Sequence, residues 1–108
     1  MNRSSPDAIL LRWRDIPSQI IVRQGRRRAR ARLSARFQNA IDRAAMRAKK
    51  RSADAYLSEW AREPLKLEAE DGAADLQGAA DRLAGRIETA YSDERLLALV
   101  RNHGLADD

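Results

Sequence analysis

Arginine is the residue type whose number and spacing in this chain could do chemistry. Of the 21 basic side chains among the 108 residues, 18 are arginines. A guanidinium presents a planar fork of N–H donors that matches carboxylates and phosphates. The densest group comprises Arg26, Arg27, Arg28, Arg30 and Arg32, and it is extended by Arg36, Arg43 and Arg47. These arginines predict a surface that binds an anionic group.

The charge is divided unevenly along the chain, which leaves the source of that anionic group open. Residues 1–51 carry 15 basic and 3 acidic side chains, whereas residues 52–108 carry 6 basic and 13 acidic ones. Such asymmetry indicates either an external anionic partner or two halves that attract each other. The simplest alternative is a solvated basic surface that pairs with the chain's own acidic half.

A protein with an acidic patch is the favoured external partner, because arginine is enriched and lysine depleted at protein interfaces. Trp13 and Trp60 are candidate anchors there, since tryptophan is enriched among interface hot spots. The alternative is nucleic-acid binding, in which residues 26–36 would neutralise phosphates. Few aromatic side chains lie near this stretch to stack on bases.

The residues needed for catalysis are scarce. Cysteine is absent and His103 is the single histidine, which excludes thiolate chemistry and any pair of histidine ligands. The chain has no glycine-rich phosphate loop and no nucleophile-elbow motif. We therefore expect a protein that is not an enzyme and needs no metal or cofactor. Because no apolar run reaches the roughly 18 residues of a membrane span, we expect it to be cytoplasmic and not bound to a membrane.

Periodicity predicts a β region at the start of the chain. Residues 8–14 and 19–23 have the apolar and β-branched pattern of two strands, and residues 15–18, with Pro17, have the composition of the turn between them. Residues 26–33 fit either a third strand with one arginine face or the beginning of a helix. Ser34 is a preferred N-cap residue, which favours a strand before it and a helix after it.

Helical spacing dominates the remainder. We expect one helix over residues 35–50 and a second, short helix that carries Trp60 inward and ends at Pro64. An acidic linker over residues 65–75 is the expected flexible segment, and two further helices follow within residues 76–104. The prediction is one α+β domain: a β region over 1–33, two helices over 34–64, the linker and the C-terminal helices.

Part of this sequence resembles a known family. The residues that carry the resemblance are Trp13, Arg14, Asp15, Ile16 and Pro17, followed by a β-branched and then a basic stretch to residue 29, and by residues 33–46 and 54–60. Over roughly residues 8–62 the chain resembles the small virulence factor domain family, which also forms the N-terminal domain of conserved virulence factor C. The resemblance implies an association with folate- and cobalamin-linked methyl transfer, within one-carbon metabolism, and brings no catalytic residue with it.

Large apolar side chains are few, which limits the expected stability. Leucine, isoleucine, valine and phenylalanine together make 21 of the 108 residues, a fraction near the limit for a globular chain. Binding to the folded state stabilises it by mass action. We therefore expect an accessory protein that docks through its arginine-rich half onto a larger protein, such as a methyl-transfer or folate enzyme.

Overall fold

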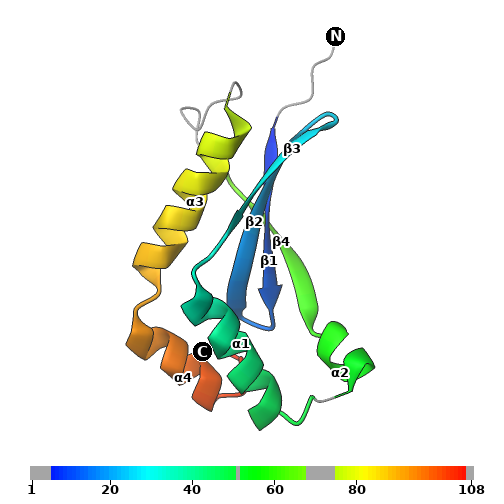
Figure 1. The fold of residues 1–108 in the computed structure, drawn as a ribbon, viewed down its shortest axis with the longest axis vertical. Coiled ribbons are helices and arrows are strands. Elements are labelled where there is room, and N and C mark those ends of the chain that lie inside the picture. Colours follow the sequence, from blue (N-terminus) through cyan, green and yellow to red (C-terminus); the bar gives the residue numbers. More distant parts are fainter. Residues whose placement is uncertain (1–5, 51, 68–74, 107–108) are drawn as a thin grey trace.

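An antiparallel sheet organises the part of the chain that the computed structural model describes, residues 6–50, 52–67 and 75–106. The first three strands, β1 (Asp7–Trp13), β2 (Ile16–Gln24) and β3 (Arg27–Arg32), form a meander. A fourth strand, β4 (Trp60–Leu65), pairs with the free edge of β1. The strand order is therefore β3-β2-β1-β4, with every neighbouring pair antiparallel (Figure 1).

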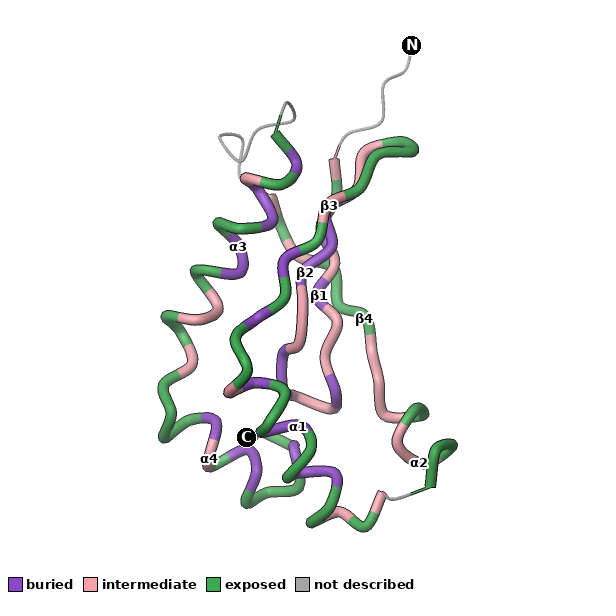
Figure 2. Tube along the Cα trace, viewed as in Figure 1, coloured by how far each residue is buried: buried purple, intermediate pink, exposed green. Residues whose placement is uncertain are grey.

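Four helices accompany the described sheet: α1 (Ala35–Arg47), α2 (Ala53–Leu57), α3 (Leu76–Ala90) and α4 (Asp93–Arg101). Helix α3 packs along β2 and β3 on one face of the sheet, whereas α1 and α4 pack against each other at its lower end (Figure 1). The inward residues of the strands meet an apolar stripe of α3, as the buried segments in Figure 2 show. The structure confirms the predicted α+β class and adds one strand to it.

The choice between strand and helix for residues 26–33 is decided by pairing with β2. Ala29 faces Val22 and Ala31 faces Ile20, so both alanines lie on the side that α3 covers. The arginines between them consequently project from the opposite side. The period of two was therefore the correct signal, and the prediction of a third strand followed by a helix is confirmed.

The turn after β1 is shorter than expected. It comprises only Arg14 and Asp15, with Arg14 in the left-handed region at φ 50°, whereas Ile16 and Pro17 are already the first residues of β2. Asp15 binds the C-terminal segment twice: its N–H donates to the carbonyl of Gly104 (2.8 Å), and its Oδ2 accepts from the N–H of Ala106 (2.7 Å). These two hydrogen bonds therefore hold the C-terminal segment against the sheet.

The prediction of two helices over residues 34–64 is wrong for residues 60–64, which do not belong to the second helix. The short helix α2 ends at Leu57, and Trp60–Leu65 is strand β4. Helical spacing suggested the helix, but the unpaired edge of β1 provides a complete set of backbone partners for an extended segment. Pro64 fits there because an edge strand tolerates a residue that donates no backbone hydrogen bond.

The remaining helices agree with the predicted positions. Helix α1 ends at Arg47, three residues before the expected end, and α3 matches the expected range. The hydroxyl of Ser92 caps α4 by accepting from the N–H of Arg95 (3.0 Å). Most of the predicted acidic linker, residues 68–74, lies outside the described residues. Within the described ranges, no helix is long and apolar enough to cross a membrane.

Candidate binding face

Among the described residues, no helix packs across the centre of the sheet face opposite α3 (Figure 1), and we call this face the open face. Residues paired across antiparallel strands share a face, so the register arranges its side chains in rows. One row comprises Arg62, Leu11, Gln19 and Arg32, and the next comprises Pro64, Ile9, Ile21 and Arg30. A third row comprises Asp7, Arg23 and Arg28, and Trp60 lies at the foot of the face, paired with Trp13.

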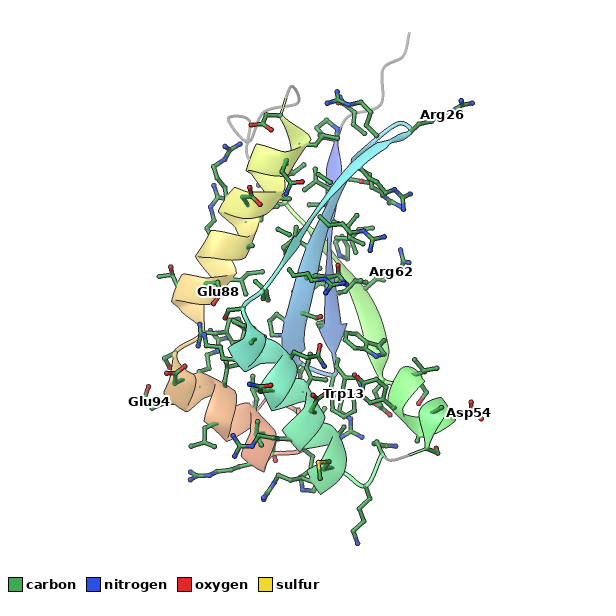
Figure 3. All side chains as sticks on the ribbon, viewed as in Figure 1. Trp13, Arg26, Asp54, Arg62, Glu88 and Glu94 are labelled. Carbon is green, nitrogen blue, oxygen red and sulfur yellow. The ribbon has the colours of Figure 1, made fainter. Side chains whose placement is uncertain are left out.

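The open face is apolar in the middle and cationic at both edges. Ile9 and Leu11 are half-buried, and Ile21 is only 6% exposed although it lies outside the main core cluster. The aliphatic stems of arginines can cover neighbouring apolar surface, and Arg30 is the cross-strand partner of Ile21. The exposed arginines at the edges are Arg28, Arg30 and Arg32 on β3 and Arg62 on β4. Figure 3 shows Arg62 projecting away from α3.

The positive charge of these edges is not neutralised within the described part of the chain. Arg23 is paired with Asp7, whose carboxylate lies 3.2 Å from the guanidinium. By contrast, none of the four exposed edge arginines forms a salt bridge with a described residue. The open face therefore presents unpaired guanidinium groups around an apolar strip, an arrangement suited to binding a surface that carries carboxylates.

Arg36 belongs to the fold and not to the predicted binding surface. Its Nη1 donates to Asp93 Oδ1 (3.0 Å), and its Nη2 donates to both the carbonyl oxygen (2.7 Å) and Oε1 (3.2 Å) of Glu88. The acidic half of the chain thus neutralises this arginine. The inclusion of Arg36 among the partner-binding residues is corrected by these contacts.

The other predicted arginines lie away from the open face. Arg26 stands at the tip of the β2–β3 hairpin (Figure 3), and Arg27 begins β3 beside it. Arg43 lines a groove of about 330 Å³ between α1 and α4, and Arg47 ends α1. The predicted arginines therefore do not form one continuous stripe. The structure brings only Arg28, Arg30 and Arg32 of that group together on the open face.

The two candidate anchors have different environments. Trp13 is completely buried, its ring stacks on Tyr56 at 5.9 Å, and its Nε1 donates to the carbonyl of Tyr56 (2.9 Å). Its role as a surface anchor is therefore excluded by burial. Trp60 is half-buried at the foot of the open face, where it meets Tyr56 edge-on at 6.0 Å. Trp60 remains available to a partner.

Several residues of the open face were not recognised from the sequence. Ile9, Leu11 and Ile21 read as ordinary strand residues, whereas Arg62 was assigned to a helix. The alternation of Trp60, Arg62 and Pro64 was the signal that could have identified β4, since it places these three residues on one side of an extended segment. The helical spacing of Leu57 and Trp60 favoured a helix instead of this strand.

A larger hollow, of about 600 Å³, lies on the other side of the sheet between β1, β4 and the helices α3 and α4. Its charged residues satisfy each other: Arg12 is 2.9 Å from Glu63 and 3.4 Å from Asp15. Arg95 lies over the ring of Tyr91, 3.8 Å from its centroid. Because Arg12, Glu63 and Asp15 are already paired and Arg95 is held by Tyr91 and by the carbonyl of Ala90, the hollow offers less to a charged ligand than the open face.

Two carboxylates outside the open face have lowered pKa values. The side-chain hydrogen bond from Arg14 lowers the pKa of Glu59 and outweighs the opposing effect of burial, with further help from the charges of Arg14 and Lys50. For Glu88, burial raises the pKa, but hydrogen bonds from the N–H and hydroxyl of Ser34 and from Arg36 together lower it below its ordinary value. Both carboxylates hold separate elements together. Within the described residues, no group of three or more histidine, cysteine, aspartate or glutamate side chains could hold a metal ion.

These pKa shifts predict loss of stability in acid. A carboxylate whose pKa is lower in the folded state stabilises the fold above its unfolded pKa, and this contribution is lost as the pH falls through the folded value. The melting temperature should therefore fall as the pH drops below about 4.5, the ordinary value for glutamate. Thermal melts of Glu88→Gln across this range should show a smaller fall than the wild type. Parallel curves for the two proteins would contradict this role of Glu88.

The fold and the open face together define a class: a small α+β protein with α3 on one side of its sheet and an arginine-edged face on the other. The profile of the family described as Virulence factor matches residues 11–100, so the chain belongs to that family. The match continues through α3 and most of α4, further than the resemblance over residues 8–62 indicated. No curated protein and no solved structure matches the chain.

Proposed function

We propose that this protein is a non-catalytic accessory protein that docks through its open face onto an acidic patch of a larger protein. The observation that carries the proposal is the distribution of side chains on that face. Ile9, Leu11 and Ile21 form an apolar centre, and the arginines at both edges form no salt bridge with a described residue. Protein interfaces have the same anatomy, with an apolar core, a polar rim and an enrichment in arginine.

The same distribution favours a protein over a nucleic acid. Proteins that bind single strands place aromatic rings where successive bases stack. The central rows of the open face contain isoleucine, leucine, glutamine and proline, and Trp60 stands at the foot. Arg36, the last arginine of the stretch 26–36 that nucleic-acid binding would use, is already paired with Glu88 and Asp93. We therefore place nucleic-acid binding second.

The family resemblance suggests the class of enzyme to which the partner belongs. A methyl-transfer or folate enzyme is the partner that the resemblance implies, and such an enzyme would supply the chemistry for which this chain has no residues. An acidic patch on that enzyme, of a size similar to the open face, is the feature to seek. Docking would also add apolar burial to a chain whose own core is rich in alanine.

The direct test is purification of the tagged protein from its source cells under gentle conditions, with crosslinking and with or without nuclease. The expected result is a captured protein that resists nuclease, dissociates as salt rises and is lost when the open-face arginines are reversed in charge. Salt dependence follows because exposed charges are screened over about 8 Å at physiological ionic strength.

A parallel measurement tests nucleic-acid binding, the second candidate function. Duplex DNA and single-stranded RNA are titrated with the purified protein at low salt, and the ultraviolet absorbance ratio of the captured material is recorded. Failure of both nucleic acids to bind, together with a captured protein, supports the proposal. Nucleic-acid binding would replace the proposed protein docking if it weakens steeply with salt and disappears in the charge-reversed variant. The proposal would be overturned if the protein elutes alone, without any crosslinked partner.

A further inference from the structure

The foot of the open face is hollowed. A depression of about 410 Å³ lies where the lower end of β2 meets the start of α1, and it is lined by Gln19, Arg32, Leu33, Ala35, Gln38 and Trp60. The lining combines an aromatic side chain, two aliphatic side chains, two amides and a guanidinium, and it also includes the hydroxyl of Ser18. Since Arg32 is exposed and forms no salt bridge with a described residue, the rim of the hollow carries an unpaired positive charge.

Gln19 carries a hydrogen-bond acceptor that the described chain does not use. Its Oε1 atom is buried and has no hydrogen-bond partner among the described residues. Buried polar atoms in proteins are nearly always hydrogen-bonded, so an unsatisfied one requires an explanation. The terminal amide torsion of glutamine is broad, and Gln19 lines the hollow, so rotation about this torsion would bring the oxygen to a donor placed there.

We propose that the hollow receives an aromatic side chain with a hydrogen-bond donor, tyrosine or tryptophan, from an acidic segment of the docking partner. This inference rests on the proposed function and specifies the chemistry of the partner. The ring would pack against Trp60 and Leu33, and its O–H or N–H would donate to Gln19 Oε1, because buried tyrosine and tryptophan groups usually require such a partner.

The arginines around the hollow define the residues that flank this anchor. Arg32 lies beside Gln19 on β3, and Arg62 stands at the opposite end of the same row on β4. Carboxylates on either side of the aromatic residue would therefore each meet a guanidinium. The recognised segment is acidic on both sides of a central tyrosine or tryptophan, which matches the tendency of binding energy to concentrate in a few central aromatic anchors.

The test uses short, uniformly acidic peptides that differ only at a central tyrosine, phenylalanine or alanine. They are titrated into the isotope-labelled full chain at low salt, and binding is followed by the amide signals of Leu11, Gln19 and Arg32. Tyrosine should bind about fivefold more tightly than phenylalanine, the ratio that one net hydrogen bond provides. Alanine should bind more weakly than both, because it lacks the ring.

Two glutamine variants determine whether Gln19 is the acceptor. Gln19→Met should abolish the preference for tyrosine over phenylalanine, yet keep or raise the melting temperature, because it replaces an unsatisfied buried acceptor with an apolar side chain. Gln38→Met is the matched control: Gln38 lines the same hollow, but its amide already donates to Asp42 (2.9 Å). It should retain the preference for tyrosine.

Each contrary result has a distinct meaning. Equal binding of all three peptides to the wild type overturns the aromatic anchor and leaves acidic docking on the open face intact. A Gln19→Met variant that melts several degrees lower and loses all peptides equally shows that Gln19 has a structural role, which also overturns the inference. Failure of every acidic peptide at low salt counts against both the anchor and the proposed function.

Discussion

The double variant Arg30→Glu, Arg32→Glu is expected to lose its protein partner while remaining folded. Both side chains are exposed on the open face and neither forms a salt bridge with a described residue, so the fold does not depend on their charge. Placing like charges opposite an acidic patch costs several kcal/mol, which corresponds to an affinity at least about a hundredfold lower. Capture from lysate measures the loss, and circular dichroism measures the fold.

The matched control is Arg43→Glu, Arg47→Glu, which makes the same change in net charge on α1. Because these two residues lie on a different surface from the open face, this variant should retain the partner. Equal loss in both double variants would show that net charge, and not the open face, attracts the partner. Full retention in the Arg30 and Arg32 variant would exclude the open face as the docking surface.

Trp13→Ala is expected to produce the largest loss of stability. The ring is completely buried, stacks on Tyr56, donates a hydrogen bond from Nε1 and fits so closely against Gly104 that a Cβ there would lie 2.9 Å from Trp13 Cζ3. Replacing a buried tryptophan by alanine costs about 3–5 kcal/mol. Small domains have only about 5–15 kcal/mol in total, so urea unfolding should show a protein close to its stability limit.

Leu57→Ala provides the comparison, since Leu57 is 61% exposed. Exposed substitutions of this kind usually change the free energy of unfolding by about 0.5 kcal/mol or less. If Trp13→Ala has as small an effect as Leu57→Ala, then Trp13 does not hold the lower end of the sheet. The amide exchange of Gly104 and Ala106 should also accelerate in Trp13→Ala, because the C-terminal segment packs against this ring and the adjoining turn.

The first five residues that carry the family resemblance, Trp13 to Pro17, build the fold. Trp13, Ile16 and Pro17 are buried, and Arg14 and Asp15 bind the chain itself. Arg14 donates to Glu59 Oε1 (3.0 Å) and to the carbonyl of His103 (2.9 Å), joining the first turn to two later segments. The motif from Trp13 to Pro17 can therefore identify the family through residues that hold the fold together.

Local patterns were sufficient to predict most of the elements. The alternation of arginine with Ala29 and Ala31 predicted β3, and helical spacing within residues 76–104 predicted α3, because each pattern reports which side of an element is buried. Ser92 signalled the start of α4 through a hydrogen bond within one turn of helix. These features depend on residues close together in the sequence, and they were predicted correctly.

The sequence by itself thus determined the class of fold, the arginine-rich character of its first half and the scarcity of catalytic groups. The tertiary structure decided which arginines lie together on one face. Arg62 lies in one row with Arg32 only because β4 pairs with β1. Arg36 forms a salt bridge within the chain because α3 brings Glu88 next to it. Both outcomes depend on contacts between residues about thirty or more positions apart, which local periodicity and composition do not encode.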